Sequence, residues 1–327
     1  MTTFSRRSLA IVAAASALAL LGTSASVAQQ RPKITASSID AAGFQSARVE
    51  HHEGARPRRQ ARLRARRQSL SLDLRLFYAA FSTGETEALI GGPTILQKLY
   101  QEGVPLRIFG TGFTLADLVV FAKDPNIKSL ADLKGKQLAA DMVGSQFQVI
   151  KIYTNAKDID LGKDITVVNA NFAVARAQLE ADRVDAALVI EPLASITLRQ
   201  NPSWRIIFNG AQGWKEITGQ EGWEIVPALR AETIARLPEA PKMLLAALQD
   251  VANVLHKETD AADKIAVDTT KLPPGILKAA VDSGRLQMIV RPAWEPATRQ
   301  SITDMMQRAV KAGFYQAMPD NKIIYAP

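Results

Sequence analysis

The sequence predicts an α/β protein with a parallel or mixed β-sheet, organised in about two domains. Its 327 residues are 47% hydrophobic, so the chain is long and apolar enough to bury a sizeable core. From Leu70 onward, short β-rich runs alternate with helical patterns, which is typical of a sheet covered by helices. The predicted strands are residues 72–78, 105–112, 117–122, 136–141, 165–170, 185–190 and 204–209.

Helical signals lie between and after these strands. Ser129 and Asp132 have the spacing of a capping box, and Gly135 stands where a one-turn helix would end. Two apolar stripes with helical spacing predict packing helices in the C-terminal third. One stripe is Leu244, Leu248, Val251 and Leu255, and the other is Ile302, Met305, Met306 and Ala309, followed by Gly313. The methionine pair is interpreted as core rather than as a soft metal site.

The first 28 residues have the order of an export signal peptide. Arg6 and Arg7 precede an apolar run from Leu9 to Leu21, and small residues follow up to Ala28. The run is shorter than the roughly 20 apolar residues that a permanent membrane helix needs. SRRSLA fits a twin-arginine signal, and the Sec route remains the alternative. Both routes predict a mature protein in the periplasm.

The net charge of +8 is concentrated in two short segments. Eight arginines between Arg48 and Arg67 are opposed only by Glu50 and Glu53, and Arg6 and Arg7 add two more charges. The rest of the chain is therefore close to neutral, which argues against a nucleic-acid partner. Residues 46–68 stand out as an anomalous Arg-rich segment.

Candidate residues for catalysis are scarce. The three histidines are His51, His52 and His256, and His256 is expected on a helix surface because it lies one position off the Leu244–Leu255 stripe. The chain contains no cysteine, which excludes disulfides and thiolate metal sites. No phosphate-binding loop, nucleophile elbow or zinc-protease motif occurs. The sequence predicts no catalytic residue, no metal and no cofactor.

Small polar loops between a strand and a helix recur in the chain. They occur in IGGPTILQKL (residues 90–99), ADMVGSQFQVIKIY (140–153) and VNANFAVARAQL (168–179). Each helix start offers unpaired backbone N–H groups that can hold an anion or carboxylate. A single such loop is as often an ordinary turn, whereas three in succession favour a ligand cleft at one edge of the sheet.

Several motifs resemble the nitrate/sulfonate/taurine-type solute-binding proteins of ABC importers. They are GTGFTLADLVVFAKDPNIKSLADLKGKQLAA, DLGKDITVVNANFAVARAQLEADRVDAALVIEP and GWEIVPAL, and the resemblance runs from about Leu72 to the C-terminus. It implies a type II periplasmic binding protein with two α/β lobes joined by crossing hinge strands. Lobe one would hold residues 30–112 and 226–327, and lobe two residues 113–225. The crossing strands would lie near Phe113–Phe121 and Trp223–Leu229.

The resemblance also implies a ligand-binding cleft between the lobes. The residues carried over to it by position are Ser37, Ser38, Gly92, Pro93, Thr94, Thr111, Gly112, Phe113, Thr114, Gly144, Ser145, Gln146, Asn169, Asn171 and Glu191. Phe113, and as further candidates Trp214 or Trp223, would stack on an organic group. Glu191 does not suit an anion, so it is expected either to orient the hinge or to meet a ligand amine or hydroxyl.

The function implied is capture of a small anionic or organic-acid solute and its delivery to an ABC permease and ATPase. The protein would act as a monomer and meet the membrane only through the permease. Two alternatives stay open: an enzyme on the same scaffold, like the thiamine-pyrimidine synthase relatives, and polyanion binding through the Arg-rich segment.

The Arg-rich segment replaces a helix that relatives carry, with a pattern like K-A-x-G-L-D-x-x-H-G-F. One choice of synonymous codons for Val49–Arg64, read one base later, encodes SSIMKARGLDARHGFE, which contains that pattern. A local frame change is therefore the first explanation of the segment, a solvated insert the second and a functional arm the third.

The gene sequence tests this explanation. We expect the codons of residues 49–64 to yield KARGLD in another frame when the gene is resequenced. Codons that yield no such helix in any frame would leave the Arg-rich segment as a genuine part of the protein.

Overall fold

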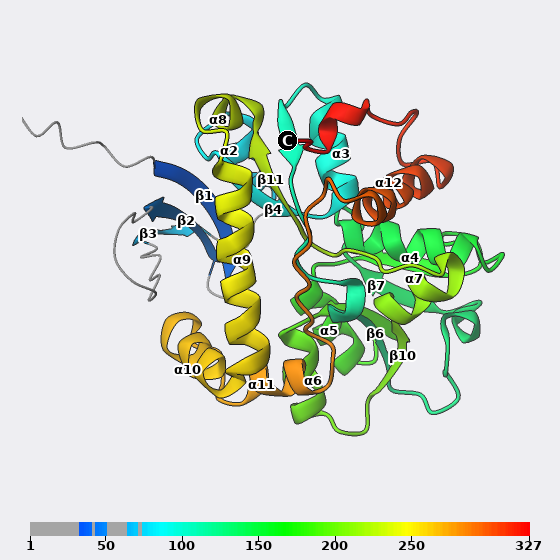
Figure 1. Cartoon of the computed structure of the whole chain (residues 1–327). Coiled ribbons are helices and arrows are strands. Elements are labelled where there is room, and N and C mark those ends of the chain that lie inside the picture. The colour runs from blue at the N-terminus through cyan, green and yellow to red at the C-terminus, as the bar shows by residue number, and fades with distance from the viewer. Residues whose placement is uncertain (1–32, 41–42, 51–63, 71–73) are drawn as a thin grey trace, which may run out of the picture.

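A computed structural model describes residues 33–40, 43–50, 64–70 and 74–327, with side chains from residue 78 onward and that of Ile34. The strands form two sheets, and helices cover both (Figure 1). The strands of the first sheet, in spatial order, are β3 (Arg64–Leu70), β2 (Gly43–Glu50), β1 (Lys33–Asp40), β4 (Ala88–Gly91), β11 (Val226–Arg230) and β5 (Leu106–Ile108). Those of the second are β10 (Arg205–Asn209), β6 (Leu118–Ala122), β9 (Ala186–Ile190), β7 (Gln137–Ala140) and β8 (Thr166–Asn169).

The first sheet combines segments that are far apart in the sequence. β1 pairs with β4 in parallel, and β11 lies antiparallel between β4 and β5. The backbone of the Arg-rich region adds β2 and β3 as antiparallel strands at the sheet edge. Residues 51–63 of that region, like the leader and residues 41–42 and 71–73, lie outside the described residues.

The second sheet is built around two strands with apolar residues on both faces. All five residues of β6 are buried, as are Ala186–Val189 of β9, which fits a strand pair covered by helices on either side. β6 runs antiparallel to β9, and β7 runs parallel to both β8 and β9. Six of the seven predicted strands are confirmed to within two residues at their starts, although β5 ends four residues before the predicted end at 112.

The predicted strand at residues 72–78 is wrong, because helix α2 (Leu74–Ser82) occupies this segment. Leucines alternate there at positions 72, 74 and 76, which suggested a strand. Leu74, Phe77, Tyr78 and Phe81 also have helical spacing, and Phe81 is completely buried. The predicted strand ended at residue 78, before Phe81, so the helical spacing was not recognised.

The remaining helices cover the sheets as Figure 1 shows. They are α3 (Pro93–Gln101), α4 (Ser145–Asn155), α5 (Phe172–Glu180), α6 (Leu193–Gln200), α7 (Gly210–Thr218), α8 (Ala231–Arg236), α9 (Ala240–Lys257), α10 (Thr259–Thr270), α11 (Ile276–Asp282) and α12 (Pro296–Lys311). α12 packs on α3 and α4 and so contacts both sheet regions, while α11 packs on α6 beside the second sheet. The chain from α11 to α12 therefore contacts helices that lie beside both sheets.

The predicted C-terminal stripes are confirmed on α12 and only in part on α9. Ile302, Met305, Met306 and Ala309 are buried, and Gly313 has a φ of +81° after the helix. On α9, Leu255 is buried but Val251 is 52% exposed, and Leu245 and Ala252 complete the buried face instead.

The predicted capping box precedes a 3-10 helix (Leu130–Leu133). The carboxylate of Asp132 accepts a hydrogen bond of 2.9 Å from the backbone N–H of Ser129, and Gly135 has a φ of +78°. Both the short helix and its end are therefore confirmed.

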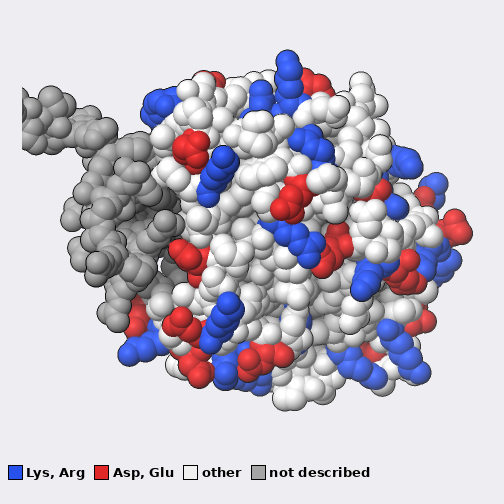
Figure 2. Space-filling model, in the orientation of Figure 1, with Lys and Arg blue, Asp and Glu red and all other residues white. Residues whose placement is uncertain are grey.

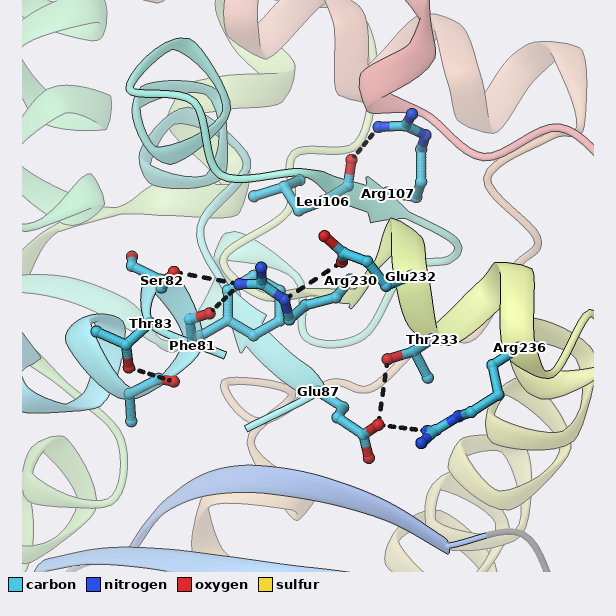
Figure 3. A network of polar contacts seen from close by, with 11 residues as sticks. Phe81, Ser82, Thr83, Glu87, Leu106, Arg107, Arg230, Glu232, Thr233 and Arg236 are labelled. Atoms are coloured by element: carbon cyan, nitrogen blue, oxygen red, sulfur yellow. Dashed lines mark hydrogen bonds and ion pairs between the residues drawn. The ribbon is translucent and has the colours of Figure 1, made fainter. Parts of the chain in front are cut away.

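Arg230, at the end of β11, ties the C-terminal end of α2 to the first sheet (Figure 3). Its guanidinium donates to the carbonyl oxygens of Phe81 at 2.7 Å and Ser82 at 3.2 Å. It also forms an ion pair with Glu232 at 3.4 Å, and its side chain is only 16% exposed. These contacts satisfy carbonyl groups that a helix end leaves unpaired.

We expect Arg230→Met to lower the free energy of unfolding by about 2 kcal/mol, because charged hydrogen bonds to buried carbonyls are lost while the aliphatic stem stays. Urea denaturation measures this change. Lys98→Met is the matched control, since Lys98 forms an exposed i,i+4 pair with Glu102 and should change stability by less than about 0.5 kcal/mol. Equal effects of the two substitutions would contradict the anchoring role.

Candidate functional site

Three chain segments cross between the two sheets and pair with one another. Residues 109–117 lead from β5 to β6, residues 219–225 lead to β11, and residues 286–293 return from α11 toward α12. Short β-bridges join Thr114 to Trp223, Phe113 to Met288 and Gly110 to Pro292. The first two segments overlap the predicted crossings near Phe113–Phe121 and Trp223–Leu229. The third was missed, although it contains the short apolar run Met288–Val290.

Four predicted ligand residues lie in these crossing segments and are used there for structure. The hydroxyl of Thr111 donates to the carbonyl of Ile289 at 2.7 Å and accepts from the N–H of Arg291 at 2.9 Å. Thr114 caps a 3-10 helix (Leu115–Asp117), and Phe113 packs against a cluster around Met288. A Cβ on Gly112 would stand 3.0 Å from the carbonyl oxygen of Ile225, so glycine permits this close crossing.

The N-terminal ends of α3 and α4 meet directly. α3 follows β4 in the first sheet, and α4 follows β7 in the second. Gly92 caps α3 and Gly144 caps α4, both with extended backbone. A Cβ on Gly92 would stand 2.5 Å from the Cβ of Ser145, closer than real atoms approach. The first two of the three predicted loops therefore face each other across the sheets, as a closed pair.

Buried polar atoms without partners gather around this contact. Thr94 Oγ1, Gln146 Oε1 and Glu224 Oε2 make no hydrogen bond within the described part of the chain. The amide nitrogen of Gln146 donates to Glu224 Oε1, and the Glu224 carbonyl lies 3.5 Å from the Cβ position of Gly92. We call Thr94, Gln146, Glu224 and Asp117 the central polar cluster; Asp117 Oδ1 likewise has no partner.

Burial shapes the protonation of this cluster. It raises the pKa of Glu224 from 4.5 to about 7, opposed in part by the hydrogen bond from Gln146. It also raises the pKa of Asp117 well above its usual value, and the negative charges of Glu224 and Glu191 add to the effect. The pKa of the Tyr78 hydroxyl is raised by burial and by the nearby charges of Glu224 and Tyr315. The cluster thus holds carboxylates that are costly to ionise.

Glu191, another predicted ligand residue, is fully paired. Its carboxylate accepts from Arg285 Nε at 2.7 Å, from the hydroxyl of Ser195 at 2.9 Å and from the N–H of Ser195 at 3.0 Å. The side chain is completely buried, and Arg285 is 16% exposed. These bonds join α6 to Arg285, which directly precedes the third crossing segment.

The third predicted loop contributes no residue to the central polar cluster. Asn169 and Asn171 are exposed and follow the edge strand β8. Asn169 accepts a hydrogen bond of 3.1 Å from the N–H of Met142, and Asn171 caps α5 through the N–H of Val174 at 3.0 Å. Ser37 and Ser38 lie within β1 rather than in a loop, and their side chains lie outside the described residues.

Several groups near the cluster were missed from the sequence. Glu224 lies inside the motif GWEIVPAL, but the pattern of that motif indicates neither its burial nor its hydrogen-bond partner. Asp117 gave no signal, because a polar residue beside a strand is usually solvated. Trp214 and Trp223 are 1% exposed and belong to the core, where the Trp223 indole donates to Ser301 Oγ at 2.8 Å.

A cavity of about 270 Å³ lies elsewhere, beside the third crossing segment. Its lining includes His256, Val281 and Leu286–Ile289. His256 is exposed, as expected, yet its Nε2 also accepts a hydrogen bond of 3.0 Å from the N–H of Met288. Among the described residues, no group of three or more His, Cys, Asp or Glu side chains is arranged to hold a metal ion.

Comparison with solved structures identifies the fold as that of periplasmic binding proteins of ABC import systems. The aliphatic sulphonate binding protein SsuA of Escherichia coli is 17% identical, with a TM-score of 0.67 over 77% of this chain and 79% of its own. The alkanesulfonate-binding protein SsuA of Xanthomonas axonopodis pv. citri, bound to MOPS, is 19% identical, with a TM-score of 0.59 over 75% and 81%. An ABC transporter protein of Parabacteroides distasonis is 15% identical, with a TM-score of 0.61 over 78% and 86%.

Residues 79–257 match the family model described as NMT1/THI5 like, so the chain belongs to this family. The match begins after the Arg-rich segment. No curated protein matches the sequence. The predicted type II binding-protein fold and the predicted family resemblance are both confirmed.

We expect Glu224→Gln to stabilise the ligand-free protein at pH 8 by roughly 3 kcal/mol and to have little effect at pH 4. A raised pKa in the folded state means that Glu224 costs no stability below about pH 4.5, and that the cost grows as the pH rises toward about 7. Urea unfolding at the two pH values measures this difference. Glu102→Gln, at an exposed carboxylate, is the control; a pH-independent effect of Glu224→Gln would contradict the burial of a titrating carboxylate.

Proposed function

We propose that this protein captures a small solute between its two α/β lobes in the periplasm and delivers it to the permease of an ABC importer. The observation that carries the proposal is the meeting of the α3 and α4 N-termini over buried, unpartnered polar atoms. Polar atoms buried without partners are costly, so a bound molecule that supplies those hydrogen bonds would stabilise the closed form. The binding-protein fold and the family support this role.

The proposed lobes keep the predicted bounds, residues 30–112 with 226–327 and residues 113–225, except that α11 (Ile276–Asp282) packs on α6 of the second lobe. They would separate by rotation about the three crossing segments, which short β-bridges join to one another. Gly92 and Ser145 are in contact here, so a solute would enter only after the lobes part. On closure, the N-terminal turns of α3 and α4 would present N–H groups to it from both sides.

Within the predicted ligand set, Gly92, Pro93, Thr94, Gly144, Ser145 and Gln146 form the proposed contact surface, with Glu224 and Asp117 added from the crossing segments. Thr111, Gly112, Phe113, Thr114 and Glu191 would hold the hinge. Asn169 would position the β7–α4 loop through Met142. The direct solute contacts would thus come from fewer residues than the sequence suggested.

The periplasmic location rests on the binding-protein fold and on the export signal proposed for residues 1–28, which lie outside the described residues. None of the helices in the described part of the chain has the length and apolar character to cross a membrane. The route, twin-arginine or Sec, stays a prediction. The permease and ATPase partners and a monomeric state belong to the same proposal.

We infer a role without catalysis. His256 is the one histidine among the described residues, and it is hydrogen-bonded to the Met288 backbone away from the central polar cluster. Polyanion binding gains no support from the described surface either. Figure 2 shows Lys and Arg interspersed with Asp and Glu over the visible face, where they form no continuous basic patch.

A thermal-shift screen of small sulfonates, carboxylates, amines and inorganic anions tests solute capture. A compound that binds the folded protein must raise its melting temperature by mass action. We expect at least one class of solute to do so, with a shift that grows with concentration. Absence of any shift over the whole screen, for the protein encoded by the verified gene, would contradict the proposal.

The Gly92–Ser145 contact gives a second test. We expect Gly92→Ala to weaken binding of the stabilising compound about tenfold, because the added methyl group would collide with Ser145 and hold the lobes apart. The double variant Gly92→Ala with Ser145→Gly removes the obstructing side chain and should restore affinity. Calorimetric titration measures both; equal affinity in all three proteins would place the binding site elsewhere.

A further inference from the structure

We infer that the captured solute carries a positively charged, hydrogen-bond-donating nitrogen group, such as an ammonium or amidinium, and that Glu224 is its anchor. This inference rests on the proposed function and departs from the anionic or organic-acid solute expected from the sequence, because it gives the solute a cationic group. It concerns the chemistry of the central polar cluster, which the resemblance to known families did not assign.

The cluster presents hydrogen-bond acceptors rather than donors. Its unpartnered atoms are the carboxylate oxygens Glu224 Oε2 and Asp117 Oδ1, the amide oxygen of Gln146 and the hydroxyl oxygen of Thr94. All four residues are at most 9% exposed. Gln146 already uses its amide nitrogen on Glu224, so its free atom is an acceptor. The Thr94 hydroxyl can also donate, as can the second N–H of the Gln146 amide and either carboxyl while it is protonated. At pH 8, above its pKa of about 7, Glu224 is mainly a carboxylate and accepts.

These acceptors come from both sides of the lobe contact. Thr94 lies in the first turn of α3, Gln146 in the first turn of α4, and Glu224 in the segment that leads into β11. An ammonium group has three N–H donors and an amidinium has four, so one such group can satisfy several acceptors together. Its charge would also compensate the burial of a carboxylate.

The chain supplies a cation to the neighbouring carboxylate but not to Glu224. Glu191 is equally buried and has Arg285 and Ser195 as partners. Among the described residues, no Lys, Arg or His forms an ion pair with Glu224 or Asp117. Because buried carboxylates are normally paired, the missing positive charge points to the solute.

Nearby arginines are already engaged. Arg285 pairs with Glu191, Arg291 pairs with Glu221 at 2.7 Å, and Arg308 pairs with Asp304 at 2.8 Å. A purely anionic solute would therefore meet Glu224 with no compensating side chain. The starts of α3 and α4 would offer backbone N–H groups to an acceptor elsewhere on the same molecule.

Matched isosteres of opposite charge test the inference at pH 8. We expect benzamidine and propylamine to raise the melting temperature of the protein, and benzoate and propane-1-sulfonate to leave it unchanged. Glu224→Gln should weaken binding of the responding cation at least about tenfold by calorimetric titration, because a charged hydrogen bond is lost. Glu221→Gln, at an exposed carboxylate paired with Arg291, is the control and should retain affinity.

The possible results separate the inference from the proposed function. Binding of the anions in preference to the cations, or an unchanged cation affinity in Glu224→Gln, would overturn the inference while leaving solute capture intact. If none of the cations binds while the wider screen yields a ligand of another class, the inference is also wrong. If no compound of any class binds, the proposed function fails as well. Circular dichroism of both variants checks that they fold.

Discussion

The contact between the N-terminal turns of α3 and α4 is the constraint on which the site depends. The strands form two separate sheets, and one of these two helices follows a strand of each sheet. Glycine at position 92 lets Ser145 approach so closely that any Cβ atom at position 92 would collide with it. In this closed contact, Glu224, Gln146 and Thr94 are buried, and each has one side-chain oxygen without a hydrogen-bond partner among the described residues. The centre of the described structure therefore contains buried polar atoms whose hydrogen bonds are missing.

In the proposed mechanism, rotation about the crossing segments would let the α3–α4 contact open and close. The three segments are paired through contacts of Thr111, Phe113 and Thr114. A hydrogen bond from Arg285 to Glu191 connects the start of the third segment to the region of α6. In the proposed mechanism, the bonds that would hold the hinge are therefore distinct from the atoms that would face the solute. A rotation about the hinge need not disturb the interior of either sheet.

The sequence predicted the fold better than the site. Strands such as β6 and β9 are recognisable because both faces are apolar, and the α12 stripe has a clear helical period. The segment at 72–78 failed because leucine alternation and helical spacing coincide there. Glycine-containing loops drew attention to the segments where Gly92 and Ser145 meet, and their role in binding stays a prediction. Glu224 could not be assigned from the sequence, because its burial and its second carboxylate oxygen, without a hydrogen bond in the described part of the chain, arise only when distant segments meet.

The most direct measurement of the account is the distance distribution between spin labels on either side of the contact. Lys98 on α3 and Val143 before α4 are exposed and, once changed to cysteine in this cysteine-free chain, provide the labelling sites. Double electron–electron resonance should show a broad distribution with long distances in the free protein and one short distance with a stabilising solute. A single distance that is the same with and without solute would contradict hinged closure over Glu224.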